Sequence, residues 1–183
     1  MDALLIHGEI GSGKTRRAAA WIEAEGLAGR SVAGVLALKS PTGRRFMDIA
    51  TGEEVPLEHP AMDEVSVTVG RFQFRQAAFD WAVRHIEQAL GQAGSVVIDE
   101  VGPLEMRGGG FAPLLDRLER DHPTIRRVLL VRTSLLDAVA DRFCRGAVTI
   151  FDPKKYRFPI LFFSSVQIHG YNSPYYLFVF SLT

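Results

Sequence analysis

The chain contains the octapeptide GEIGSGKT directly after the apolar run at residues 3–7, ALLIH. The octapeptide fits the pattern G-x-x-x-x-G-K-[S/T] at Gly8, Gly13, Lys14 and Thr15. A loop of this kind surrounds phosphate oxygens with backbone N–H groups, which requires positive φ angles and little side-chain bulk, and glycine supplies both. A helix that begins at the lysine adds its free N–H groups and its dipole. The motif therefore constrains this region to a strand, a phosphate-binding loop and a helix.

A second feature lies further along the chain, where residues 96–100 read VVIDE. This is a short apolar run that ends in the carboxylates Asp99 and Glu100. Ligands of parallel sheets bind at the carboxyl ends of the strands, so we expect both carboxylates to lie beside the glycine-rich loop. Asp99 would then hold Mg²⁺, mainly through its water shell, and Glu100 would orient and deprotonate an attacking water. An apolar run before two acids is weak evidence alone and gains weight only with the loop.

Together the two motifs predict a site for a nucleoside triphosphate and Mg²⁺. Lys14 is expected to reach the β- and γ-phosphates, and the Thr15 hydroxyl to ligate Mg²⁺ together with Asp99. The predicted catalytic residues are Glu100, Lys14 and Thr133. Thr133 is included because it follows an apolar strand, where a polar group could sense the γ-phosphate. The predicted nucleotide contacts are Gly8, Glu9, Ile10, Gly11, Ser12, Gly13, Lys14, Thr15 and Arg16. We expect the Glu9 side chain to point to solvent, since its charge would repel phosphate.

Short apolar runs alternate with amphipathic segments, which predicts an α/β domain with a mainly parallel sheet flanked by helices. Strands are expected at residues 1–7, 31–39, 44–50, 65–69, 95–98, 127–131 and 147–151. Helices are expected at residues 14–25, 73–90, 111–120 and 134–143, the last capped by Ser134. The turn signal at residues 41–43 predicts a β-hairpin insertion over residues 31–50. Residues 51–63 are expected to form a loop.

Composition excludes several classes of protein. The 183 residues are enough for one compact domain, and 21 basic side chains balance 21 acidic ones, so neither a nucleic acid nor a membrane surface is an expected partner. The single cysteine, Cys144, excludes an internal disulfide framework, and a buried structural role is expected for it. We see no signal peptide and no apolar stretch long enough to span a bilayer. A cytoplasmic protein, acting as a monomer, is the expectation.

The C-terminal part differs in composition from the rest. All four tyrosines lie within residues 156–183, whereas alanine is absent after Ala147. We therefore divide the chain into a phosphate-binding domain at residues 1–150 and an aromatic-rich segment at residues 151–183. Aromatic side chains favour strands, so the segment is expected either to form an edge strand or to be a tail foreign to the domain, such as the product of a shifted reading frame.

The order of the motifs carries a family resemblance. GEIGSGKT is followed by VAGVLALK, a turn, GRRFMDIATGEEVPL, VGRFQFRQAAF, and VVIDEVGPLE with GGGF. The sequence resembles the small nucleoside-triphosphatase family that includes the cancer-related nucleoside triphosphatase and its archaeal and bacterial relatives. The resemblance covers residues 1–145 and implies a RecA-like sheet and Mg²⁺-dependent hydrolysis of ATP, GTP and other nucleoside triphosphates with little base preference. By it, Lys14 and Thr15 contact nucleotide and metal, while Asp99 and Glu100 serve Mg²⁺ and water.

Hydrolysis is favoured because Glu100 occupies the position of a water-activating base, which a kinase needs to keep free. Two alternatives stay open: a nucleotide or nucleoside kinase, and a non-enzymatic nucleotide-binding switch. Glu105 either orients the water or pairs with an arginine, or else caps a turn. Arg132 is a candidate to neutralise transition-state charge, although most arginines are surface residues.

Roles for the hairpin and the FQF segment also stay open. Arg44 and Arg45 could touch a base or a phosphate, although a solvated strand edge is the simpler interpretation. Phe72 or Phe74 could stack on a base, although core packing is favoured. His7 lies on the buried strand before the loop, and we expect a structural role for it.

Overall fold

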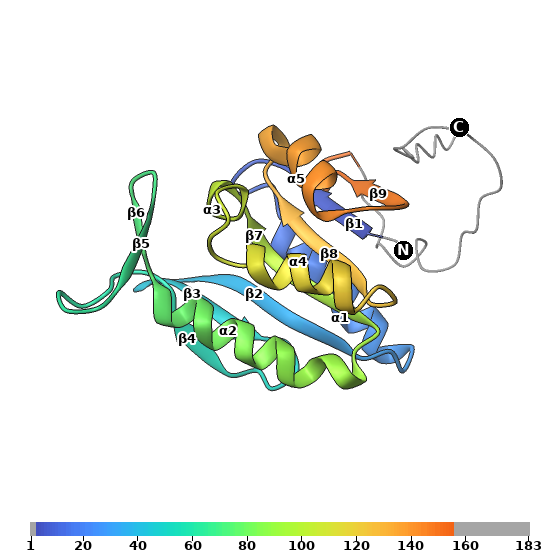
Figure 1. Cartoon of the computed structure of the whole chain (residues 1–183), viewed down its shortest axis with the longest axis horizontal. Helices are drawn as coiled ribbons and strands as arrows, with labels where there is room; N and C mark the ends of the chain where they lie inside the picture. Colours follow the sequence, from blue (N-terminus) through green and yellow to red (C-terminus); the bar gives the residue numbers. More distant parts are fainter. Residues whose placement is uncertain (1–2, 156–183) are drawn as a thin grey trace.

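A seven-stranded sheet forms the centre of the computed structural model, which describes residues 3–155 (Figure 1). The strand order is β4-β3-β2-β7-β8-β1-β9. The strands of this sheet are β1 (Ala3–His7), β2 (Val32–Ser40), β3 (Gly43–Asp48), β4 (Glu54–Pro56), β7 (Ser95–Val101), β8 (Arg126–Val131) and β9 (Val148–Phe151). The helices are α1 (Lys14–Leu27), α2 (Gln76–Ala89), α3 (Pro103–Met106), α4 (Ala112–Asp121) and α5 (Leu136–Phe143), with the short 3₁₀ helices η1 (Leu90–Gln92) and η2 (Thr133–Leu135). The predicted α/β fold is confirmed.

The register of the parallel strands brings the two sequence motifs to one edge of the sheet. Strand β8 lies between β1 and β7 and pairs in parallel with both. His7, the last residue of β1, is opposite Val131, and Val131 is also opposite Val101 at the end of β7. The loop after β1 and the acid pair of β7 therefore emerge side by side, with only the end of β8 between them.

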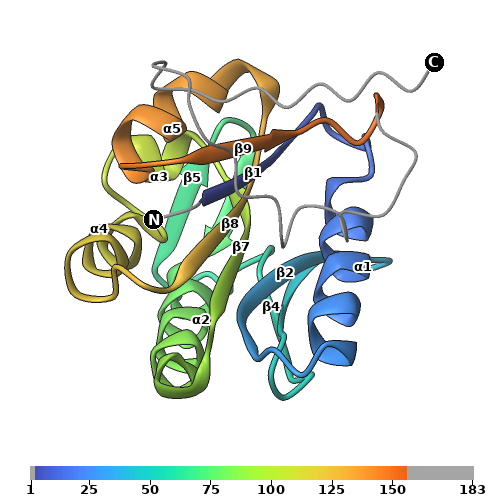
Figure 2. The same cartoon turned by 90° about the vertical axis from the view of Figure 1, so that its right-hand side faces the viewer.

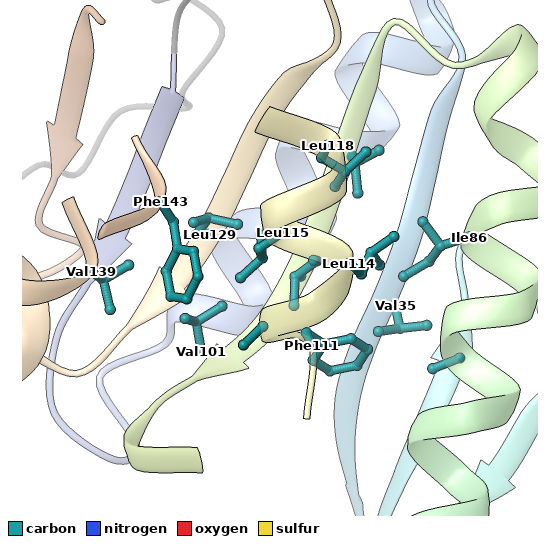
Figure 3. Close-up of a cluster of buried hydrophobic side chains, with 14 of the residues drawn as sticks. Val35, Ile86, Val101, Phe111, Leu114, Leu115, Leu118, Leu129, Val139 and Phe143 are labelled. Carbon is teal, nitrogen blue, oxygen red and sulfur yellow. The ribbon is translucent and has the colours of Figure 1, made fainter. Parts of the chain in front are cut away.

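Helices cover both faces of the sheet, as Figure 2 shows, with α1 on one face and α2, α4 and α5 on the other. Side chains alternate accordingly along β1: Leu4 and Ile6 pack with Trp21 of α1, whereas Leu5 faces the opposite core. Figure 3 shows part of that larger core, in which α4 packs over the strands between α2 and α5. Its labelled members are Val35, Ile86, Val101, Phe111, Leu114, Leu115, Leu118, Leu129, Val139 and Phe143.

Antiparallel strand pairs are added to this parallel core, among them β3 with β4 at the edge of the sheet. Strands β2 and β3 form the hairpin predicted for residues 31–50. Strands β5 (Ser66–Val69) and β6 (Phe72–Arg75) form a separate two-stranded sheet, which we call the arm and which projects from the body in Figure 1. Helix α2 begins directly after the arm, so the arm is joined to a helix that packs on β2 and β3.

Three local predictions were wrong. A helix over residues 73–90 was expected, but Phe74 pairs with Val67 in the arm and the helix begins only at Gln76, because alternating apolar residues of FQFR fit a strand. The predicted loop at residues 51–63 contains β4, which is recruited by pairing with β3. Ser134 is not a helix cap: it lies within η2, and α5 follows with Leu135 at its N-cap position.

The prediction for the C-terminal segment lies largely outside the described residues. Strand β9 ends at Phe151 and is followed by a turn up to Lys155. Residues 156–183, on which the edge-strand and foreign-tail alternatives depend, are not among those described. Within residues 3–155, no helix combines the length and the apolar character needed to cross a bilayer.

Gly34 of β2 offers a direct test of the packing between β2 and β7. Its φ is 132°, and a Cβ atom at this position would lie 2.0 Å from the carbonyl oxygen of Val97. Since backbone cannot move aside cheaply, we expect Gly34→Ala to lower the free energy of unfolding by about 3–5 kcal/mol. Gly26→Ala is the matched control, because Gly26 lies in α1 and a Cβ atom there would meet nothing within 4 Å, so it should change stability by less than about 1 kcal/mol. Chemical denaturation measures both, and equal effects would contradict the packing described.

Candidate active site

The glycine-rich loop joins β1 to α1 and leaves the start of the helix open. Gly13, at the N-cap position, has a φ of 90°, a conformation that glycine adopts without steric cost. As far as the described residues go, α1 has no capping side chain and no acidic residue in its first turn. Its first N–H groups are therefore not used by a local cap and can bind an anion. The buried hydroxyl of Ser12 lacks a hydrogen-bond partner within the described part of the chain, which leaves a further polar group at this loop.

Lys14 folds back over the loop. Its Nζ donates hydrogen bonds to the carbonyl oxygens of Gly8 at 2.6 Å and of Glu9 at 3.0 Å. Burial lowers the pKa of Lys14, while the carboxylates Asp99 and Glu100 act in the opposite direction. A partly desolvated ammonium gains more from a phosphate than a solvated one does, because less water has to be removed from it.

Asp99 is buried behind Thr15. The Thr15 hydroxyl donates to Asp99 Oδ2 at 2.8 Å, and the backbone N–H of Ala37 donates to the same oxygen at 3.1 Å. Burial raises the pKa of Asp99 to about 6, against the stabilising effect of these hydrogen bonds on the carboxylate. Hard oxygen atoms held this close together suit Mg²⁺, which prefers carboxylate, hydroxyl and water ligands.

Glu100 points the other way from its neighbour. Its φ is 67°, and the register of β7 against β8 is irregular between Ile98 and Val101. Successive side chains of a strand point to opposite faces, and here Asp99 is buried whereas the Glu100 side chain is 41% exposed. The Glu100 carboxylate forms an ion pair with Arg44 of β3.

These groups line one cleft with a volume of about 590 Å³. The lining includes residues 10–15 and the acid pair, together with the end of β2, Arg44 and residues of the arm. Phe46, Phe79 and Phe111 contact one another edge to face at centroid distances of 5.4 Å and contribute to the apolar lining. The cleft therefore combines anion-binding groups with aromatic side chains.

The sequence profile of one family, described as NTPase, matches residues 3–152. The chain belongs to this NTPase family. No curated protein sequence matches the chain significantly.

A solved structure supports the fold of this NTPase family member. The chain is similar to the crystal structure of THEP1 from the hyperthermophile Aquifex aeolicus, with a TM-score of 0.65 and 19% sequence identity. The match covers 88% of this chain and 95% of THEP1. At this identity the likeness concerns the fold and not the details of the site.

The structure of the NTPase brings most of the predicted site residues together, but not all of them. Lys14, Thr15, Asp99, Glu100 and most of the loop line the cleft, and so does Arg132. Thr133 is exposed and does not line the cleft, and its hydroxyl lies 3.4 Å from Nδ1 of His7. Glu9 is exposed, as predicted, and Arg16 is exposed on α1 outside the cleft.

Glu105 has a structural role in this fold. One carboxylate oxygen accepts from the N–H of Gly102 at 2.8 Å and the other from the N–H of Phe111 at 3.2 Å. Burial raises the pKa of Glu105 to about 6. Glu105 therefore caps the turn at the start of α3, which is one of the alternatives that the sequence left open.

Sequence reasoning missed the environment of Arg44. A solvated strand edge was the simpler interpretation, but the Arg44 side chain is only 12% exposed and is held by Glu58 and Glu100. Glu58 was not connected to the site in the sequence, and Phe72 and Phe74 were considered only for stacking on a base, because their contacts with Arg44 depend on tertiary structure. A partly buried arginine beside a basic neighbour on a hairpin carries no local signal of its own.

Asp99 makes the stability of the nucleotide-free protein depend on pH. Because the pKa of Asp99 in the fold, about 6, is above its ordinary value of 3.8, the folded chain binds more protons between these pH values, and the Asp99 contribution to stability falls as pH rises through them. Asp99→Asn removes this effect, so we expect the variant to be more stable than the parent at neutral pH by up to about 3 kcal/mol. Denaturation without Mg²⁺ from about pH 4 to about pH 8 measures the difference. Asp63→Asn, at an exposed loop position, is the control, and a variant destabilised at neutral pH would contradict the prediction.

Proposed function

We propose that this NTPase hydrolyses nucleoside 5′-triphosphates to the diphosphate and phosphate in a Mg²⁺-dependent reaction. The observation that carries the proposal is the convergence of the glycine-rich loop, the Thr15–Asp99 contact and the exposed Glu100 carboxylate in a single cleft. A site for binding alone would need the loop, but it would not need an exposed carboxylate placed beside it.

The chain's own residues account for each requirement of the reaction. The first N–H groups of α1 and the Lys14 ammonium hold the phosphates and stabilise the negative charge that develops on them. Glu100 accepts the proton of the attacking water. Thr15 and Asp99 would hold Mg²⁺, which when bound supplies charge neutralisation at the β- and γ-phosphates.

Broad base use belongs to the same proposal. The residues named above are assigned to phosphate, metal or the attacking water and none to a base, and a site of this kind distinguishes bases poorly. The proposal also includes that the protein acts as a monomer on free nucleotides in the cytoplasm. Its catalytic domain would lie within residues 1–150.

Phosphate release with the four common nucleoside triphosphates, with Mg²⁺ and with a chelator, tests this function. We expect release from all four with rates within about tenfold of one another, and loss of release with the chelator. Addition of candidate nucleoside and nucleotide acceptors should not divert the phosphoryl group. Transfer to an acceptor in preference to water would favour a kinase, and binding without release would favour a switch.

A further inference from the structure

Arg44 joins four segments of the chain at the cleft. Its Nε donates to Glu58 Oε1 at 2.6 Å, and Nη1 donates to the carboxylate of Glu100. The guanidinium carbon lies 4.7 Å from the ring centroid of Phe72 and 4.8 Å from that of Phe74, which are the two aromatic residues of β6. We call Arg44, Glu58, Phe72 and Phe74 the Arg44 clamp.

The clamp fixes the guanidinium more firmly than an ordinary surface ion pair would. The second Glu58 oxygen accepts from the backbone N–H of Arg44 at 3.0 Å, so the same carboxylate holds both the main chain and the side chain. The Phe72 and Phe74 rings are nearly parallel, at 9°, with centroids 6.1 Å apart, and they offer the cation two aromatic faces. Although burial opposes it, hydrogen bonding from Arg44 lowers the pKa of Glu58, which keeps the carboxylate ionised.

Glu100, which the Arg44 clamp contacts, has a backbone conformation that its neighbours must hold in place. Among residues 3–155, His59 and Glu100 are the only residues other than glycine with a positive φ angle. Such a conformation persists where neighbouring groups hold it, and the contact that holds the Glu100 carboxylate comes from Arg44. Arg45, the next residue, pairs instead with Glu54 outside the cleft lining, and the Arg45 side chain is 31% exposed against 12% for Arg44.

We propose that Arg44 is a positioning residue, which fixes the Glu100 carboxylate in the orientation needed to activate water; this rests on the proposed function. In the reaction a water oxygen forms a bond to the γ-phosphorus while the bond to the β–γ bridging oxygen breaks. The electron pair leaves with the diphosphate, and the proton of the water goes to Glu100. The arm contributes to catalysis through Phe72 and Phe74, which hold Arg44.

Steady-state kinetics of Arg44→Ala, Arg44→Lys and the control Arg45→Ala provide the first test. We expect Arg44→Ala to lower kcat about 10²-fold with KM changed less than about threefold, because the residue acts on the nucleophile's base and not on binding. Arg44→Lys should recover about tenfold of the loss, since it keeps the charge but not the planar fork. Arg45→Ala should stay within about twofold of the parent.

A double-mutant cycle separates positioning from a merely structural role. If Arg44 acts through Glu100, Arg44→Ala should change the single-turnover rate less than about threefold when Glu100→Gln is already present. Phe72→Leu keeps most of the apolar volume but removes the aromatic face, so it should lower kcat about fivefold. This variant replaces Arg44→Ala in the test if Arg44→Ala does not fold.

The outcomes that overturn this inference differ from those that overturn the proposed function. Three results would each overturn the positioning role. They are an Arg44→Ala variant with the parent's kcat, an Arg44→Ala effect confined to KM, and rate effects of Arg44→Ala and Glu100→Gln that multiply in the double mutant. A parent protein that releases no phosphate, or a Glu100→Gln variant as active as the parent, would overturn the proposed function itself.

Discussion

Lys14→Met is expected to lower kcat/KM by about 10³-fold or more and to weaken nucleotide binding, while the protein stays folded. The ammonium lies over the loop at hydrogen-bond distance from the carbonyl groups of Gly8 and Glu9, where a bound polyphosphate would replace these contacts. Methionine has a similar length and no charge, so it removes the attraction to the β- and γ-phosphates without leaving a large void. Because burial already lowers the pKa of Lys14, loss of the charge should cost little stability.

Calorimetric titration with a magnesium nucleotide and phosphate-release kinetics measure this effect. Lys154→Met is the control, since Lys154 is an exposed lysine near the end of the described chain and outside the cleft. A Lys14→Met variant that binds and turns over like the parent would show that the loop does not hold the phosphates.

Glu100→Gln is expected to lower kcat by about 10²–10⁴-fold while triphosphate affinity stays within a few-fold of the parent. Glutamine keeps the size of the side chain and an oxygen that can accept from Arg44, but it cannot take a proton from water. The variant should therefore retain unhydrolysed triphosphate, which can be recovered from the protein and identified by chromatography.

Glu54→Gln is a matched control, because Glu54 also pairs with an arginine of β3 but does not line the cleft. A Glu100→Gln variant with nearly normal turnover would rule out Glu100 as the base and would favour the interpretation of the chain as a binding module. If Glu54→Gln keeps its activity while Glu100→Gln loses it, the loss of turnover is specific to the site.

The parts of the fold that local sequence determines were predictable. The glycine-rich loop and the run before Asp99 and Glu100 each carry their chemistry within a few residues, and the parallel sheet follows from the alternation of apolar strands with helices. The hairpin was predictable for the same reason, since a turn signal separates two strand-like runs.

What could not be predicted depends on contacts between distant segments. Glu100 and Arg44 are 56 residues apart in sequence and meet only because β3 and β7 flank β2. The start of α2 is a different case: Phe74 pairs with Val67 in the neighbouring strand, and the alternating apolar residues of FQFR are a local strand signal that the helical pattern from Gln76 onward obscured. The exposed position of Thr133 follows from η2, which no residue pattern indicated.

The most direct test of the central claim is hydrolysis in ¹⁸O-labelled water, with the products analysed by mass spectrometry. If the loop holds the triphosphate and Glu100 activates water at the γ-phosphorus, the released phosphate carries solvent oxygen, the diphosphate carries none, and Glu100→Gln suppresses the labelled product. Solvent oxygen in the diphosphate, or phosphate release that does not depend on Glu100, would contradict the account.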